Sequence, residues 1–232
     1  MSQAGLVARL AVRELWMTFR LLAVLVAFIG GSAIVVLVPA APAVTLDRLE
    51  LALGLASVIA SGVAAWSLAA ERTAGRSGWL ITRSVSRRTY LAGWFAGLAL
   101  VAAAGVTGAG LLGFLAVYSL PVGIDRVTFG ATILAVAAAA AAAVAVGLAI
   151  GALLRPIPAA IVAMLACAAA GLAASSVPES ASLIPGGAFG MLGDLVGSTT
   201  GFPDAIRAGG AGLLSTAGLL VLAGWAMERA EL

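Results

Sequence analysis

The charged side chains of this 232-residue chain are few, and many gather in residues 71 to 88, which read ERTAGRSGWLITRSVSRR. Five of the thirteen arginines lie there, around the apolar residues Trp79, Leu80 and Ile81. Guanidinium groups bond carboxylates, carbonyls and phosphates, and this mixture is typical of a short amphipathic helix on a membrane surface or against a partner. A second interpretation stays open, in which the positive loop only fixes membrane topology.

Catalytic residue types are scarce. The chain has no histidine and a single cysteine, and its ten acidic residues lie near the ends of apolar runs. It contains no HExxH, no GxGxxG and no phosphate-binding loop. We therefore expect no enzyme activity and no cofactor in this chain. Nucleic acid is also not expected as a partner, because the arginines are spread between apolar runs and do not form one solvated basic face.

Composition indicates which elements must position the arginine-rich stretch. The chain is 62% hydrophobic and 10% charged, with a mean hydropathy of +1.14, whereas a soluble domain is about 45–50% apolar. A membrane-spanning helix needs about 20 apolar residues, and six stretches qualify. Because these runs lack the alternation of barrel strands, we predict an all-α, polytopic membrane protein. It forms one domain over residues 1–232, with spans at about 21–39, 51–70, 89–119, 128–154, 157–176 and 208–227.

The arginines also predict the orientation of the six spans. When the spans divide the chain into alternating sides, ten of the thirteen arginines fall on the side of the two termini. Positive charge is enriched on the cytoplasmic side of membrane proteins, so both termini are expected to be cytoplasmic. The five tryptophans fall near the ends of spans on the same side, where an amphipathic ring suits the headgroup layer.

The segment before the first span, LVARLAVRELWMTFR, is amphipathic. At 100° per residue, Arg9, Arg13 and Arg20 project within a stripe about 40° wide, and apolar residues cover much of the remainder. We therefore predict an interfacial helix over about residues 4–20 that carries these arginines and Trp16. The alternative is a helix that merely extends the first span into the headgroups.

Residues 176 to 207, between the fifth and sixth spans, are apolar yet contain three prolines and many glycines. One continuous span is incompatible with these breakers. The pattern predicts short re-entrant or interfacial helices before the sixth span, and a disordered outer loop is the alternative.

The order of residues in the 71–88 stretch resembles the signature of the type-2 ATP-binding-cassette exporter permeases. In that family the second span ends in a pattern like E-R-E-x-G-T-L-x-x-L-L-x-T-P-V-S-R. This chain departs from the pattern where Thr73 replaces the second acid, Arg76 the threonine and Ser84 the proline. The plan of an amphipathic first helix, six spans and short outer helices is also similar. The matching positions are Glu71, Arg72, Gly75, Leu80, Val85, Ser86 and Arg87, followed by RTYLAG at 88–93.

The resemblance implies a membrane-spanning permease subunit of an exporter, which forms half of the translocation path. It implies a separate cytoplasmic ATPase that binds ATP and Mg²⁺, and a second permease subunit, identical or different. The location implied is the bacterial cytoplasmic membrane. The alternative is a non-transporting scaffold or sensor subunit that recruits a soluble partner through the same loop. The coupling residues, within loop 71–90, would be Glu71, Arg72, Gly75, Trp79, Leu80, Ile81, Arg83, Arg87 and Arg88.

Overall fold

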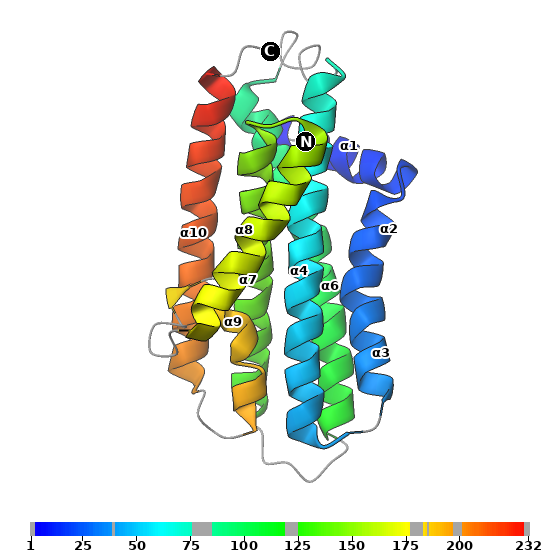
Figure 1. Cartoon of the computed structure of the whole chain (residues 1–232), viewed down its shortest axis with the longest axis vertical. Helices are drawn as coiled ribbons and strands as arrows, with labels where there is room; N and C mark the ends of the chain where they lie inside the picture. Colours follow the sequence, from blue (N-terminus) through cyan, green and yellow to red (C-terminus); the bar gives the residue numbers. More distant parts are fainter. Residues whose placement is uncertain are drawn as a thin grey trace.

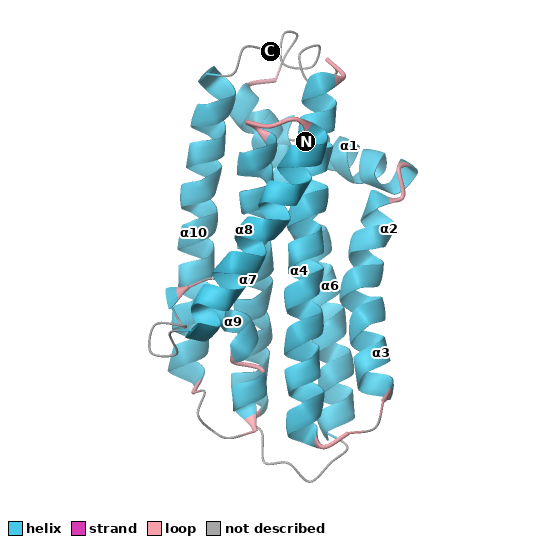
Figure 2. Ribbon diagram, in the orientation of Figure 1, coloured by secondary structure: helices cyan, strands magenta, loops and turns pink. Residues whose placement is uncertain are grey.

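The computed structural model describes residues 3–38, 40–75, 85–118, 125–176, 183–184, 186–196 and 201–229. Within these ranges the regular structure is helical and no strand occurs (Figure 2). Six helical segments of the described residues are long and apolar enough to cross a membrane. The all-α, polytopic fold predicted from the sequence is therefore confirmed.

The spans stand side by side along the long axis of the molecule (Figure 1). The first consists of α2, a single π-helical segment η1 and α3, and the other five are single α-helices. Their bounds are α2 Arg20–Leu25, η1 Val26–Gly30, α3 Gly31–Leu37, α4 Pro42–Thr73, α6 Arg87–Tyr118, α7 Arg126–Gly151, α8 Pro156–Ser176 and α10 Phe202–Arg229.

Two of the helices extend well beyond the apolar runs that predict them. α4 begins at Pro42, where the missing proline N–H costs no intrahelical hydrogen bond, and continues through the charged turn at residues 47–50. α10 begins at Phe202 and carries Asp204 in its first turn, where a negative charge favours the helix. Charged residues mark the edge of the apolar run, but the helix does not end there.

The amphipathic helix α1 (Gln3–Met17) lies across the bundle at one end (Figure 1). Val7, Ala11 and Leu15, spaced one helical turn apart, are buried, and α1 packs on α6. Gly97 of α6 permits this approach, because a Cβ added there would lie 3.2 Å from a backbone carbonyl oxygen of α1. The buried face fixes α1 on the bundle.

The boundary between α1 and the first span differs from the sequence prediction. α1 ends at Met17, and Phe19 adopts the left-handed conformation with φ 57°. Arg20 is therefore the first residue of α2, not the last of the interfacial helix, and its Nη1 donates to Ser67 Oγ at 3.4 Å. The break also rules out a helix continuous with the first span, because a left-handed residue changes the chain direction.

The remaining surface of α1 is amphipathic. Arg9 and Arg13 are exposed, as are the apolar side chains of Leu6, Leu10 and Trp16. A helix that carries arginines and exposed apolar side chains outside its packed face suits the headgroup layer of a bilayer. This arrangement agrees with the interfacial position predicted for the segment.

α4 and α7 are packed closely in their C-terminal halves. A Cβ added at Gly147 would lie 2.9 Å from the Cβ of Ala64, and one added at Gly151 would lie 2.6 Å from the carbonyl oxygen of Ala65. Only glycine fits at such distances, so the backbones of the two helices touch. Close backbone approach at small residues stabilises helix pairs in membranes, where no hydrophobic effect drives association.

Two short helices precede the sixth span at the opposite end of the bundle, as the sequence predicts. α9 (Gly187–Gly190) and η3 (Gly193–Leu195) pack against α4, and Ala188, Leu192 and Leu195 are buried. Residues 186–196 are therefore an ordered cap on the bundle, and a disordered loop does not describe them.

The N-terminus of α7, at that same end, is capped by Asp125. Its Oδ2 accepts from the backbone N–H of Thr128 at 2.9 Å and from the Thr128 hydroxyl at 2.8 Å. The Thr128 side-chain hydrogen bond, followed by the backbone one, lowers the pKa of the Asp125 carboxyl. The charged carboxylate also suits the positive end of the helix dipole.

Candidate functional site

The described residues of loop 71–90 lie at the end of the bundle where α4, α7 and α10 finish and α6 begins (Figure 1). We call this the loop end. α4 ends at Thr73, and Gly75 follows with φ 71°, a left-handed conformation that glycine adopts without strain. Four of the predicted coupling residues lie outside the described residues, namely Trp79, Leu80, Ile81 and Arg83.

The first end of the loop is held by Arg72. Its Nη1 donates a 3.0 Å hydrogen bond to the carbonyl oxygen of Gly151, the last residue of α7. Carbonyls in the last turn of a helix lack intrahelical partners, and a guanidinium satisfies both their hydrogen bonding and the negative end of the helix dipole. We call this contact the α4–α7 clamp. The preceding residue, Glu71, is buried beside it.

The second end of the loop is held by Arg87. Its Nη1 donates to the carbonyl oxygens of Met227 at 2.6 Å and Glu228 at 3.0 Å, both in the last turn of α10. We call this pair of hydrogen bonds the α6–α10 clamp. Ser86, the residue before α6, caps this helix, because its Oγ accepts the backbone N–H of Thr89 at 3.1 Å. Arg87 is thereby fixed at the start of a span and bonded to the end of another.

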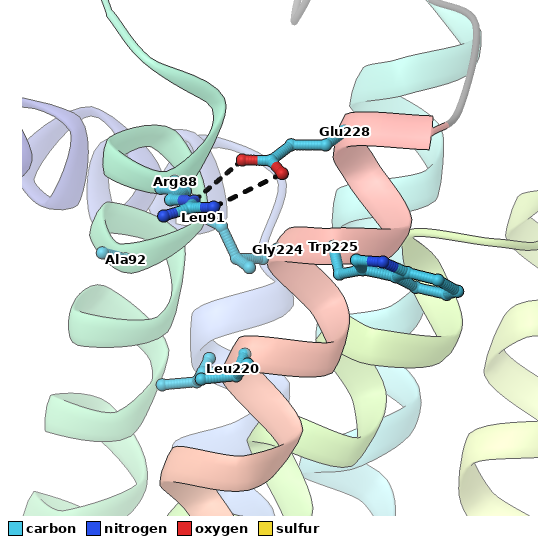
Figure 3. A pocket seen from close by; sticks show the side chains of 8 residues that line it. Arg88, Leu91, Ala92, Leu220, Gly224, Trp225 and Glu228 are labelled. Atoms are coloured by element: carbon cyan, nitrogen blue, oxygen red, sulfur yellow. Dashed lines mark hydrogen bonds and ion pairs between the residues drawn. The ribbon is translucent and has the colours of Figure 1, made fainter.

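Arg88, the next residue, faces Glu228 across the same pair of helices (Figure 3). Its Nε lies 2.8 Å from Glu228 Oε1 and its Nη2 lies 3.4 Å from Oε2. The two side chains are 78% and 43% exposed. Exposed ion pairs contribute little to stability, so this pair adds charge and orientation to the surface more than binding energy between the helices.

Buried side chains support the start of α6. Val85 is buried just before the helix, and Tyr90 and Trp94 are buried one and two turns into it. The two rings meet edge to face, with centroids 6.5 Å apart, an arrangement that aromatic pairs favour. The position of Arg87 and Arg88 is therefore set by a packed helix start.

The structure separates the predicted coupling residues into two groups. Arg72 bonds α7, whereas Arg87 and Arg88 bond α10, so they do not form one cluster. Sequence reasoning missed the partner groups. The carbonyls of Gly151 and Met227 are backbone groups, so residue type cannot predict that they are partners. The Glu228 side chain could have been considered from the sequence, because it is an acidic residue on the arginine-rich side of the membrane.

These features define an all-α, multi-pass membrane protein with two arginine clamps at one end of its bundle. No protein-family model matches the sequence, and no curated protein matches it. Functional inference therefore rests on the residues and their contacts.

Proposed function

We propose that this chain is the membrane-spanning permease subunit of an ATP-binding-cassette exporter, with residues 71–90 as its ATPase-coupling loop. The observation that carries the proposal is the pair of clamps at the two ends of this loop. Arg72 bonds the end of α7, and Arg87 bonds the end of α10. A force on the loop is therefore transmitted directly to α4 and α6 and, through hydrogen bonds, to α7 and α10.

In the proposed mechanism, ATP-driven closure of the partner ATPase pushes on the loop and shifts the packing of the spans between inward-facing and outward-facing states. Trp79, Leu80 and Ile81 supply the apolar contacts to the ATPase. Such a change requires helices with two discrete arrangements. Backbone contact joins α7 to α4 at Gly147 and to α10 at Gly212, where an added Cβ would lie 3.0 Å from the backbone of Ala138. These contacts favour movement of α4, α7 and α10 as one body relative to α6.

The composition of the complex follows from what the chain lacks. No phosphate-binding loop occurs in the sequence, so ATP and Mg²⁺ bind to a separate cytoplasmic ATPase. In the family that residues 71–88 resemble, six spans form half of a path, so a second permease subunit, identical or different, completes it. The surrounding lipid contacts the exposed apolar face of α1.

The loop end of the bundle is proposed to face the cytoplasm of a bacterial cell, as the arginine distribution favours. Single cysteines at Ala74, at the loop end, and at Ser176, at the opposite end of α8, test this in a Cys167→Ala background. Both residues are exposed. In intact cells an impermeant maleimide should label S176C and not A74C, and labelling of A74C alone would reverse the orientation.

The function is tested by purification of the full chain from its native membrane, with mass spectrometry and an ATP hydrolysis assay. We expect a copurifying protein that contains a phosphate-binding loop. ATP hydrolysis should disappear from the preparation when this partner protein is removed from the chain. A soluble partner without ATPase activity would contradict the proposal and favour a scaffold or sensor. Hydrolysis by the isolated chain would contradict it too.

A further inference from the structure

The first membrane span is not a uniform α-helix. Between α2 and α3 lies η1, a π-helical turn over Val26–Gly30, and the backbone N–H of Gly31 donates to the carbonyl oxygen of Val26, five residues back. Single π turns of this kind are rare, and they hold one residue more than an α turn does. Because each residue turns an α-helix by about 100°, the side chains of α3 point about 100° away from the directions that a straight continuation of α2 would give them.

The π turn places a polar side chain inside the bundle. Ser32 is the one polar residue between Arg20 and Thr45, yet its side chain is fully buried, whereas Ile34 and Leu37 of the same helix are exposed. The Ser32 Oγ has no hydrogen-bond partner among the residues that the structure describes. A buried hydroxyl without a partner is unfavourable, and a different register of α3 would remove this cost.

A second register, shifted by one residue, presents an equivalent face to the bundle. The present inner face of α3 consists of the buried Ser32 and the half-buried Val35 and Val36. When the π turn becomes an α turn, each residue of α3 takes the place of its successor, so the inner face becomes Gly31, Ile34 and Val35. A small residue replaces a small one and β-branched residues replace valines, so both faces fit the same contact. Ser32 then leaves the interior, and its hydroxyl can donate to a carbonyl of the preceding turn.

The contacts of the first span hold α2 more firmly than α3. Leu21 and Val24 of α2 are buried, and Arg20 Nη1 donates to Ser67 Oγ at 3.4 Å. In α3, by contrast, Ser32 is the only buried residue. A rotation at η1 therefore falls on α3, whose other side chains are apolar and can face lipid in either register.

Two opposing effects meet at the turn. Phe28, within η1, is fully buried, and an added Cβ at Gly105 of α6 would lie 2.8 Å from the Phe28 Cβ. This close contact favours the present register, whereas the unpaired hydroxyl of Ser32 opposes it. The consecutive glycines Gly30 and Gly31 lie where the backbone must change, and glycine adapts its backbone most easily.

We propose that η1 is a register switch, at which α3 alternates between the present register, with Ser32 at the buried position, and a second register, with Gly31 at that position. The change rotates α3 by about 100° and shifts it by about 1.5 Å relative to α2. It gives the bundle an element with two discrete arrangements. The switch does not depend on the proposed export function, because it rests on the contacts of the first span.

Distances between two spin labels, measured by double electron–electron resonance on the full chain in phosphatidylcholine nanodiscs, test the switch. The labels are attached after L37C in α3 and L214C in α10, in a Cys167→Ala background. Both leucines are exposed, and the two helices stand on opposite sides of the bundle (Figure 1). We expect two distances, because the rotation moves the label on α3, and the distance that fits the present register should be the more populated.

Substitutions at the two small residues should select one register each. G31L leaves the present register intact, because an added Cβ at Gly31 meets nothing within 4 Å, but leucine is too large for the buried position of the second register. G31L should therefore show the first distance alone, and S32L the second alone. S32A removes the unpaired hydroxyl and should raise the ratio of the first to the second distance at least about fivefold. The matched control is G130L, at an exposed glycine of α7 with equal space, which should keep the wild-type distribution.

Three results would overturn the proposal. The first is a single distance in the wild type that G31L leaves unchanged, which decides the matter even where S32L does not fold. The second is a pair of distances whose ratio is the same in the wild type, G31L and S32L, because the two populations would then arise outside η1. The third is a lower ratio in S32A than in the wild type, which would mean that the hydroxyl stabilises the present register.

Discussion

The two clamps of loop 71–90 hold it to helix pairs of different character. On the α4 side, Arg72 bonds α7 where the two backbones touch, and small residues leave no space between the helices. On the α6 side, Arg87 bonds α10 beside an open groove and an exposed ion pair. The first pair is packed like a protein interior, and the second has room to rearrange.

This difference indicates how a push on one loop could have a directed effect. A rigid pair transmits displacement, whereas a loosely packed pair absorbs it by changing its packing. A directed effect requires that both ends of the loop are firmly attached to the bundle, and the hydrogen bonds of Arg72 and Arg87 provide these attachments. Variants on the two sides should therefore differ in stability and in their response to conditions.

Replacement of Gly147 by Ala should give the largest effect. The new methyl group would collide with the carbonyl oxygen of Ser61 and lie 2.9 Å from Ala64 Cβ, so α4 and α7 must separate. Overpacking of this kind costs about 3 kcal/mol. Unfolding in detergent by SDS titration measures the free energy. G130A, on an exposed part of α7 where an added Cβ meets nothing within 4 Å, is the matched control.

A Gly-to-Ala substitution at Gly224, in α10, tests the more loosely packed pair of helices. G224A should be tolerated, because its Cβ would lie 3.9 Å from the nearest neighbour. A loss of stability in G224A as large as that in G147A would show that the two helix pairs are equally packed, and the contrast between them would be wrong.

Arg72→Gln should have the next largest effect. The variant loses a charge-assisted hydrogen bond to the end of α7, from a half-buried side chain, at a cost of about 2 kcal/mol in unfolding free energy. R155Q removes the same charge from an exposed position at the same end and should change stability little. Equal effects of R72Q and R155Q would reduce the α4–α7 clamp to a surface charge.

Breaking the exposed pair between Arg88 and Glu228 should affect stability less than R72Q does. Solvent and salt screen exposed charges, so the difference between wild type and E228Q should vanish at high ionic strength. Thermal unfolding at low and high salt measures this. A large, salt-independent loss in E228Q would mean that this side is as firmly packed as the other.

Acid titration gives the smallest expected effect, at the far end of α7. The pKa of Asp125 is lowered in the folded state by its hydrogen bonds to Thr128. Its contribution is therefore fully present above the unfolded pKa, and it is lost as pH falls from about pH 4 through the folded value. D125N keeps a capping side chain without the titration, so the wild type should lose its advantage over D125N in this range. An advantage constant with pH would contradict this.

The sequence predicts the six spans well, because hydropathy alone forces apolar runs of this length into helices. It does not predict the break at Phe19, since a left-handed aromatic residue has no signature in residue type. Nor does it predict that α4 begins at Pro42, because a helix continues past the edge of the apolar run.

The candidate site was predicted in part. The arginines could be named from their clustering in residues 71–88, but the carbonyls that Arg72 and Arg87 bond belong to the backbone and depend on which helix ends meet in space. Sequence positions far apart, such as Arg87 and Met227, come together only through the packing of whole spans.

The coupling role proposed for the loop is tested most directly by the triple variant W79S/L80S/I81S, which keeps every charge. Apolar and aromatic anchors can contribute about 2 kcal/mol or more each to an interface. The control is L183S, at an exposed apolar residue of the opposite end. ATPase copurification, ATP hydrolysis and membrane insertion are measured for both.

If the loop couples the spans to an ATPase, the triple variant should insert normally but lose the copurifying ATPase and its hydrolysis, while L183S should retain both. Normal insertion with unchanged ATPase copurification and hydrolysis in the triple variant would contradict the coupling role, and would leave the arginines of this loop as topology determinants.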